Sequence, residues 1–362
     1  MRKKIYLMRP EVNSDELKLV KMVLASKTLT EGKITQKFER KVARYVHSKY
    51  AIATTSATTA LHTSLVSIGV AGKKILVSDF TFPATAHAVT LAGGTPVLVD
   101  VDRNTMNVTS EIIENLIDSE INFVLPVSIF GNPLEKKFYQ LKARGMKIIE
   151  DAATNLGTKV ENKYVGSLAD ITCFSFHPRK IITTGEGGMI TTNNKKLADQ
   201  CASFKIFGKV KKEFTRFGTN YKLSDILSAV GLAQLQKIER IIRKRRMKAK
   251  IYNELLSKID YVELQEPTLN SRHTYQSYVC CITKPNLRDK IRKELAQHNV
   301  ETQIGTYALH CLPAFKNCLK KGNLSNSEYL YKNTISLPLH HELQTKDQEF
   351  ICNTIRKMGS SQ

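Results

Sequence analysis

The stretch YAIATTSATTALHTSLVSIGV, residues 50–70, contains a short apolar run, then a turn of small hydroxyl residues, then a helical stripe of apolar side chains. A strand, a tight turn and a helix in this order are the opening of a parallel α/β unit. The pattern recurs between residues 74 and 194, with strands predicted in KILVSD, TPVLVDVD, FVLPVSIFG, MKIIEDAA, ITCFSFH and MITTNN. Near-continuous Val, Ile and Leu runs that alternate with helical segments predict a mostly parallel sheet, covered by helices on both faces.

The chain changes its pattern after a long helical stretch at residues 222–256. Eight basic residues between positions 236 and 250, beside an apolar stripe of isoleucines, indicate a solvated helix face rather than an acid-binding surface. Beyond about residue 260, YVCCIT, NLRDKIRKELAQHNV and VETQI predict strand, helix and strand. We therefore predict a large domain at residues 1–245, which includes an N-terminal segment, and a smaller C-terminal α/β domain at residues 246–362.

The composition of the 362 residues is that of a globular protein, with 42% hydrophobic and 24% charged residues, which excludes intrinsic disorder and a fibrous repeat. No apolar run approaches the ~20 residues that a membrane helix needs. The start, MRKKIYLMRPE, has a basic flank without the apolar region of a secretory signal, so we expect a cytoplasmic enzyme with no membrane partner. The seven cysteines form no C-x-x-C pair, which favours reduced thiols over a disulfide framework or a metal site.

The net charge of +22, from 55 Lys and Arg against 33 Asp and Glu, admits three explanations. A nucleic-acid partner would bring zinc-finger spacing or an RNA-binding aromatic motif, and the sequence has neither, so no nucleic acid is expected. An anionic substrate could exploit long-range electrostatic steering. A lysine-rich surface with no such function would give the same charge.

Four features follow predicted parallel strands, at the edge where open α/β sheets bind ligands. TTSATTAL (54–61) opens a helix with N–H groups and hydroxyls that suit a phosphate, although an ordinary Ser or Thr helix cap has the same pattern. Asp151 closes the apolar strand MKIIED, and a buried acid needs a partner such as a protonated ring nitrogen, a helix N-terminus or a structural cation. Phe82, in DFTFPATAHAV, could cover the face of a cofactor ring or pack in the core.

The fourth feature is FSFHPRKIITTGEGG (174–188), in which Lys180 follows a strand and precedes a Gly-rich turn. A lysine attacks carbonyl carbons when an apolar site or a cationic neighbour lowers its pKa. Pyridoxal phosphate suits such a lysine, because its aldehyde condenses with the amine and its ring nitrogen needs a carboxylate. Lys180 alone could be a surface lysine. Together with a phosphate turn, an aromatic residue and an acid, it predicts a pyridoxal-phosphate site.

Seven segments, in order over about residues 6–340, resemble the DegT–StrS family of nucleotide-sugar aminotransferases. They are TLTEGKITQKFE, YAIATTSATTALHTSL, DFTFPATAHAVTLAGGTPVLVDVD, EDAATNLG, GSLADITCFSFHPRKIITTGEGGMITTNN, RFGTNYKLSDILSAVGLAQLQKIE and ISLPLH. The FSFH-x-x-K-x-x-x-x-GEGG portion is the most specific. The resemblance implies an aspartate-aminotransferase-like α/β fold (pyridoxal-phosphate fold type I) and a homodimer whose active sites draw residues from both subunits.

The resemblance also implies a role for each site residue. Lys180 matches the Schiff-base lysine, Asp151 the acid that keeps the pyridine nitrogen protonated, and Phe82 the aromatic residue stacked on the ring. It implies these further contacts: Ala57, Thr58 and Ser175 at the phosphate, Thr154 facing the cofactor's phenolic oxygen, Asn220 reaching the phosphate from the neighbouring subunit, and His310 near the sugar-binding cleft.

Three departures from the family pattern concern cofactor and substrate contacts. Ala57 replaces a usual glycine, and a backbone N–H contact survives that change if the turn does not need a positive φ. Thr154 replaces a longer Gln or His, so its contact with the cofactor could need a bridging water. Ser128 and Phe207 each replace a frequent histidine, in VSIFG and KIFGK.

The identity of residue 180 also separates branches of the family. Lys180 argues against the branch that carries histidine there and dehydrates its substrate. The segment HPRKIITTGEGG is similar to that of members acting at C4, and it implies transamination of a nucleotide-linked 4-keto-6-deoxy sugar with L-glutamate as amino donor. The alternatives are a 3-keto sugar, a non-sugar cyclic ketone, or a regulatory relative without turnover.

Overall fold

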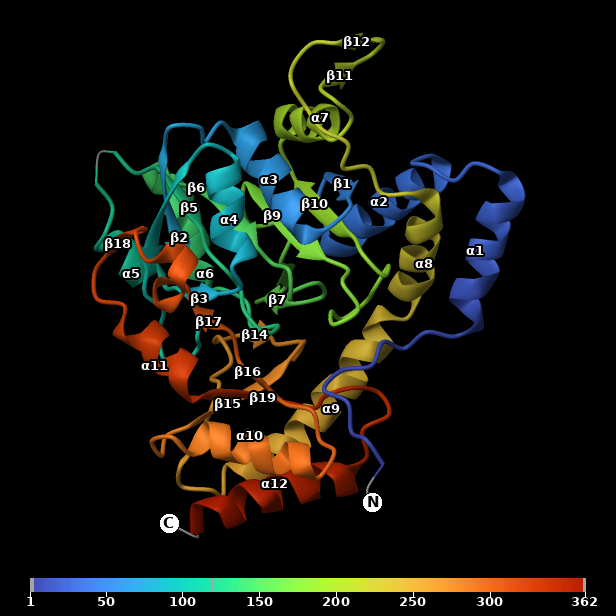
Figure 1. The fold of residues 1–362 in the computed structure, drawn as a ribbon. Helices are drawn as coiled ribbons and strands as arrows, with labels where there is room; N and C mark the ends of the chain where they lie inside the picture. The colour runs from blue at the N-terminus through green and yellow to red at the C-terminus, as the bar shows by residue number, and fades with distance from the viewer. Residues whose placement is uncertain (1–2, 119, 361–362) are drawn as a thin grey trace.

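The computed structural model describes residues 3–118 and 120–360. Among these residues the largest layer is an eight-stranded sheet with the strand order β1-β10-β9-β6-β5-β2-β4-β18 (Figure 1). Its strands are β1 (Tyr50–Thr54), β10 (Gly188–Thr192), β9 (Ile171–Ser175), β6 (Lys147–Asp151), β5 (Phe123–Leu125), β2 (Lys74–Ser78), β4 (Thr95–Val99) and β18 (Leu319–Lys321). β10 is antiparallel to both of its neighbours, and every pairing from β9 to β18 is parallel. The predicted mostly parallel sheet is confirmed.

Helices cover both faces of this sheet, as the alternation of side chains along β2 shows. Ile75 and Val77 pack in the cluster on one face, whereas Leu76 packs with Phe138 in the cluster on the other face. The first face is covered by α3 (Ala57–Ile68), α4 (Ala84–Leu91) and α7 (Lys195–Phe204), and the second by α2 (Lys33–Val46), α5 (Ser110–Glu114), α6 (Lys136–Gln140) and α8 (Asp225–Gln236).

The predicted long helix at 222–256 is two helices, α8 and α9 (Ile238–Leu256), which meet at Lys237. The prediction of a solvated basic face is wrong for two of its residues. The Lys237 ammonium lies 2.6 Å from Glu16 of α1 (Ser14–Ser26), and both side chains are buried. Arg245 is also buried and donates to the backbone carbonyls of neighbouring residues, and burial lowers its pKa to about 9. Packing against α1 and against the C-terminal part of the chain removes these cations from solvent.

A second, antiparallel sheet of the described chain has the order β13-β15-β19-β16 and forms the lower part of Figure 1. Its strands are β13 (Val262–Leu264), β15 (Tyr278–Ile282), β19 (Thr334–Leu337) and β16 (Gln303–Ile304). α9, α10 (Leu287–Gln297) and α12 (Thr345–Ser360) pack on it around a separate core. The N-terminal segment joins this region, because Ile5 forms a backbone bridge with Val300.

Residues 246–362 contribute to both sheets. β17 (Tyr307–Ala308) pairs with β3 (Phe80–Thr81), and β18 extends the large sheet beside β4. α11 (Ser325–Asn333) lies against β17 and β3. The domain boundary expected between residues 245 and 246 falls inside α9 and stays a prediction.

The remaining short elements lie outside these two layers. They are the three-stranded sheet of β14 (Ser271–Arg272), β7 (Lys159–Val160) and β8 (Lys163–Tyr164), the hairpin of β11 (Lys209–Val210) and β12 (Glu213–Phe214), and the 3₁₀ turns η1 (Leu141–Arg144), η2 (Leu309–Cys311) and η3 (Pro313–Phe315). Within residues 3–118 and 120–360, no helix has the length and apolar character needed to span a membrane.

Candidate functional site

Seven of the nine expected site residues lie at one edge of the large sheet, where its parallel strands end. This edge is where ligands bind open α/β sheets, because the loops that leave neighbouring strands converge there. The positions are Ala57 and Thr58 after β1, Phe82 after β3, Asp151 at the end of β6 with Thr154 in the loop that follows, and Ser175 at the end of β9 with Lys180 in the turn before β10.

Asp151 is a buried carboxyl with few partners. Its Oδ2 accepts a hydrogen bond from the Thr85 hydroxyl at 2.7 Å, and its Oδ1 accepts one from the Ala153 N–H at 3.1 Å. Burial raises the pKa of Asp151, while these two hydrogen bonds and the nearby Lys180 oppose the rise. A cation placed against this carboxyl would stabilise its charged form.

Lys180 lies in the turn between β9 and β10, where its N–H donates to the His177 carbonyl at 2.8 Å. Burial is the main reason that the pKa of its amine is lowered. Asp151 opposes this effect, and the neighbouring Arg179 guanidinium adds to it. An amine with a lowered pKa is more often in the neutral form, which is the form that attacks a carbonyl.

Small residues and backbone N–H groups surround the start of α3. Ser56 caps the helix and accepts from the Thr59 N–H at 3.1 Å, so the ordinary capping role is present. Because a helix leaves its first N–H groups without intrahelical acceptors, those of Ala57 and Thr58 are available to an anion. Gly188 lies against this turn, and a Cβ there would come within 2.2 Å of the Ser56 carbonyl oxygen. Gly188, at the end of the Gly-rich turn, is therefore needed for the close approach of the two backbone segments.

Two hydroxyl residues flank the lysine and the acid. Ser175 is buried at the end of β9, and its Oγ accepts from the His177 N–H at 3.3 Å, which leaves its own proton for another acceptor. The Thr154 Oγ1 lies 2.9 Å from both the Ser128 carbonyl and the Asn155 Oδ1. Its single proton is thus donated within the protein, so Thr154 has only acceptor capacity left.

Phe82 presents an aromatic ring to the open side of the same edge. Its side chain is 63% exposed, unlike those of its buried neighbours Phe80 and Thr81 in β3. The Phe82 ring centroid lies 6.3 Å from that of Tyr307, because β17 pairs with β3. An exposed ring at this edge can cover a flat ligand, whereas a core residue could not.

His310 is hydrogen-bonded to a buried acid, Asp79, which directly follows β2. The Asp79 Oδ2 lies 2.6 Å from the His310 Nδ1, and the Asp79 Oδ1 accepts from the His310 N–H at 2.9 Å. Burial raises the pKa of Asp79, and the contacts with His310 oppose this rise. The Nε2 of His310 lies 3.3 Å from the Cys311 sulfur. Asp79 thus fixes the orientation of the imidazole ring.

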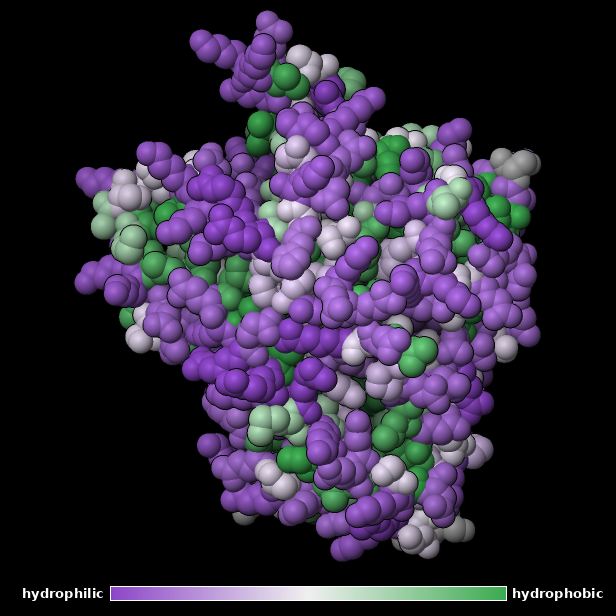
Figure 2. Space-filling model, turned by 180° about the vertical axis from the view of Figure 1, so that it is seen from behind, coloured by the Kyte–Doolittle hydropathy of each residue, from purple (hydrophilic) through white to green (hydrophobic). Residues whose placement is uncertain are grey.

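Asn220 is separated from the other site residues. It is exposed, precedes α8 and forms a backbone bridge with Ile206. The β11–β12 hairpin that precedes it projects from the molecule (Figure 1), and the same projection is visible from behind in Figure 2. Phe214 is 68% exposed and Phe217 99% exposed on this projection. Such apolar exposure is typical of a surface that another chain covers.

Sequence reasoning missed three residues that shape the site. Thr85 holds Asp151, Gly188 makes room for the phosphate turn, and Asp79 holds His310. Thr85 and Asp79 lie in or beside quoted motifs, but their partners are 66 and 231 residues away along the chain. A polar residue directly after the apolar run KILVS was the available signal for Asp79, as it was for Asp151 in MKIIED.

Comparisons with known proteins show the family and the fold of the chain. Residues 10–356 match the model of the DegT/DnrJ/EryC1/StrS aminotransferase family. GDP-perosamine synthase of Escherichia coli O157:H7 is 32% identical, with 99% of each chain covered. The UDP-4-amino-4,6-dideoxy-N-acetyl-beta-L-altrosamine transaminase of Campylobacter jejuni is 29% identical over 95% of this chain and 94% of that one. The Helicobacter pylori aminotransferase PseC, involved in the biosynthesis of pseudoaminic acid, superposes with a TM-score of 0.93 at 27% identity, covering 99% and 100% of the chains.

The fold and the family match define a pyridoxal-phosphate-dependent aminotransferase of fold type I. The chain belongs to the DegT/DnrJ/EryC1/StrS aminotransferase family, and it is a nucleotide-sugar aminotransferase. Its own residues fit the cofactor. Asp151 has no cation within ion-pair distance among the described residues, the Lys180 amine has a lowered pKa, and the first N–H groups of α3 lack intrahelical acceptors.

Proposed function

We propose that this protein transfers the amino group of L-glutamate to a nucleotide-linked 4-keto-6-deoxy sugar. The observation that supports the proposal is that the half-buried Lys180 and the buried Asp151 lie near enough at the sheet edge for each to affect the pKa of the other. The printed names of the relatives support the substrate class, since they are a GDP-perosamine synthase and a transaminase of a UDP-linked 4-amino-4,6-dideoxy sugar. The expected cytoplasmic location suits such a substrate and stays a prediction.

In this proposal each residue of the edge has one task. Bound pyridoxal phosphate supplies an electron sink for the carbon that loses or gains a proton. Asp151, oriented by Thr85, would hold a proton at the ring nitrogen. The N–H groups of Ala57 and Thr58 and the Ser175 hydroxyl would bind the phosphate, and Phe82 would cover the ring face.

Lys180 would also move the proton. Its amine, which a lowered pKa keeps available as a base, would take a proton from Cα of glutamate. In the second half-reaction the same group would return a proton to the sugar carbon that receives nitrogen, so the two substrates are used in turn. Thr154, which has acceptor capacity only, would contact the cofactor's phenolic oxygen through a water. His310, fixed by Asp79, would face the sugar.

The test of this assignment is Lys180→Ala. It should remove the visible absorbance of the lysine-bound cofactor and lower both half-reactions by at least about 100-fold, because one general acid–base group contributes 10²–10⁴. Lys196→Ala, at an exposed lysine of α7, is the matched control and should keep both. Turnover retained in Lys180→Ala would refute the assignment.

The sugar position is tested with a substrate panel. Wild-type protein that glutamate has converted to the amino form should aminate nucleotide-linked 4-keto sugars, and mass detection of the product reports the transfer. Amination of the 3-keto members of the panel instead would move the reaction to C3. Bleaching by glutamate without any aminated sugar would contradict the proposed substrate class.

We also propose a homodimer in which Asn220 serves the partner's site. The exposure of Asn220 and of the apolar hairpin before it supports this arrangement. Lys180→Ala and Asn220→Asp subunits, each inactive alone, should regain about a quarter of the wild-type rate when mixed, because half of the dimers are mixed and each has one intact site. An unmixed control of each variant sets the baseline. A mixture no more active than these controls would exclude shared sites.

A further inference from the structure

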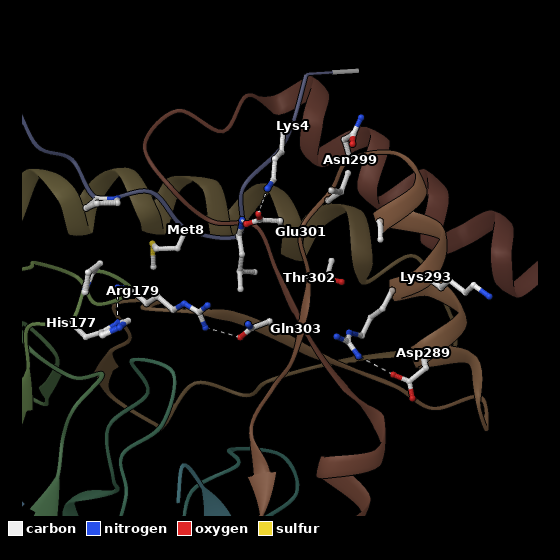
Figure 3. Close-up of a pocket in the computed structure, with 16 residues that line it drawn as sticks. Lys4, Met8, His177, Arg179, Asp289, Lys293, Asn299, Glu301, Thr302 and Gln303 are labelled. Carbon is white, nitrogen blue, oxygen red and sulfur yellow. Dashed lines mark hydrogen bonds and ion pairs between the residues drawn. The ribbon is translucent and has the colours of Figure 1, made fainter. Parts of the chain in front are cut away.

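A large cleft lies on the other side of the lysine turn from the large sheet. Its volume is about 1130 Å³, above the roughly 300–1,000 Å³ of common small-molecule pockets. Three segments line it: the N-terminal segment with Lys4, the turn with His177 and Arg179, and α10 with the strand that follows it (Figure 3). The cleft is therefore large enough for a nucleotide and borders the residue next to Lys180.

Basic side chains outnumber acidic ones in this cleft. Lys4, Arg179, Arg292 and Lys293 line it, against Asp289 and Glu301. The two acids are already occupied, because Glu301 lies 2.7 Å from Lys4, and Asp289 is shared between Arg288 at 2.7 Å and Arg292 at 3.1 Å. The surplus charge is positive, because one carboxylate serves both Arg288 and Arg292, and among the described residues no carboxylate lies within ion-pair distance of Arg179 or Lys293.

Among the cations that line the cleft, Arg179 is the one that directly precedes Lys180 in the chain. Its Nη1 donates to the Gln303 Oε1 at 3.1 Å, and Figure 3 shows its side chain extending from the lysine turn toward β16. In the described part of the chain no carboxylate lies within ion-pair distance of it. A guanidinium with four further N–H groups, held at one end of a large basic cleft, is suited to the two-oxygen face of a phosphate.

The cleft also connects with the lysine itself. Met8 and Pro10 of the N-terminal segment line both the cleft and a small adjoining cavity of about 20 Å³, which Lys180 lines as well. Arg179 lowers the pKa of Lys180 through charge, so an anion bound at Arg179 would reverse part of that effect. An anion bound in the cleft should therefore change the pKa of Lys180.

We propose that the diphosphate of the nucleotide-linked substrate binds in this cleft, between Arg179 and Arg292. The inference rests on the proposed function, because it assigns the nucleotide part of the same substrate. Glutamate is far too small to fill such a volume, whereas a nucleoside diphosphate that extends from a sugar at Lys180 matches it in size and charge. Part of the net charge of +22 would then steer the substrate to this opening.

Holoenzyme binding of UDP, GDP and dTDP, with inorganic pyrophosphate as the probe for the diphosphate alone, tests this site by calorimetry. Arg179→Gln and Arg292→Gln should each weaken the best nucleoside diphosphate at least about tenfold, because each removes a charge-assisted hydrogen bond. Lys290→Gln makes the same charge change on the same helix outside the cleft and should stay within about twofold. Added salt should weaken wild-type binding more than binding by the variants.

A spectroscopic readout separates binding from folding. In wild-type protein a nucleoside diphosphate should raise the pH at which the visible absorbance of the lysine-bound cofactor titrates. In Arg179→Gln the titration should start higher and no longer respond to the ligand. Binding and titration in both arginine variants that match the wild type would overturn the inference.

The result also separates this inference from the proposed function. If the wild type aminates a nucleotide-linked sugar and both arginine variants do so with the wild-type KM, the proposed function stands and the cleft assignment is wrong. If glutamate bleaches the wild type but no nucleoside diphosphate binds and no such sugar is aminated, the substrate class falls and the cleft assignment falls with it.

Discussion

Asp151 and Arg179 act on Lys180 from two regions that are built differently. Asp151 is buried at the end of β6, and its orientation is set by Thr85 and by the backbone that follows. Arg179 is exposed on the turn before the lysine and borders a cleft that is open to solvent. One raises the pKa of the amine and the other lowers it.

The contrast explains how chemistry and substrate choice can be separated in one site. Charges inside the sheet edge interact in a low-dielectric surrounding and are little affected by salt, whereas charges around the cleft are screened. Changes at the sheet edge should therefore alter the rate and the cofactor. Changes at the cleft should alter substrate affinity and its dependence on salt.

The largest effect is expected from Asp151→Asn. The amide keeps the shape and an acceptor for Thr85 but cannot hold a proton at the cofactor's ring nitrogen, so kcat should fall by at least about 100-fold. Absorbance and rapid-mixing kinetics with glutamate measure the fall. Asp289→Asn, an acid on the cleft side, is the contrasting control and should change KM more than kcat. Equal effects of the two substitutions would abolish the distinction between the regions.

A smaller effect is expected from Gly188→Ala. The added methyl would meet the Ser56 carbonyl at 2.2 Å, so the phosphate cradle must shift, and cofactor affinity should fall about tenfold or more. Gly185→Ala is an informative companion, because its Cβ would meet no atom within 4 Å although its φ of 87° favours glycine. It should cost stability without the same loss of cofactor. Dialysis against buffer and titration with pyridoxal phosphate give the affinities.

The pH dependence of stability should reveal Glu150, which precedes Asp151 on β6 and is fully buried against Tyr139 and Ser128. Burial raises its pKa from 4.5 to about 7. The folded state therefore keeps a proton that the unfolded state has lost, and stability falls as pH rises from about 4.5 to about 7. This group should cost up to about 3 kcal/mol of unfolding free energy at pH 8 relative to pH 4.5.

Glu150→Gln keeps an acceptor for both partners and should lose this part of the pH dependence. Denaturant unfolding at pH 5 and pH 8 measures the change. Glu349→Gln, on the exposed side of α12, is the control and should leave the dependence as in the wild type. If the unfolding free energy of the wild type changed between pH 5 and pH 8 in the same way as that of Glu150→Gln, the buried, protonated carboxyl would be contradicted.

The smallest effect is expected from Ala57→Gly. Ala57 begins α3 in an ordinary helical conformation, and it is absent from the residues with positive φ among those described. The turn therefore does not need glycine, and the proposed N–H contact with the phosphate would be the same for both residues. Cofactor affinity should change by less than about threefold, as measured by the same titration. A large gain in affinity would show that the methyl group obstructs the phosphate.

Local patterns in the sequence were sufficient to predict most of the strands and to select the candidate site residues. The apolar runs ending in Ser78, Asp151 and Ser175 mark strands β2, β6 and β9, because strands buried on both faces of a parallel sheet are mostly apolar. The Gly-rich turn and the lysine before it stand within 15 residues, so their association could be read directly.

What the sequence by itself determined about this protein is the alternation of strands and helices, the position of Lys180 and Asp151 at strand ends, and the family. Only the tertiary structure decided that β18 joins the large sheet, that Thr85 and Asp79 hold Asp151 and His310, and that Lys237 and Arg245 leave solvent. The physical reason is the separation along the chain of the residues that interact. Periodicity and turn chemistry depend on residues a few positions apart, whereas strand pairing, burial and buried hydrogen bonds depend on which distant segments pack together.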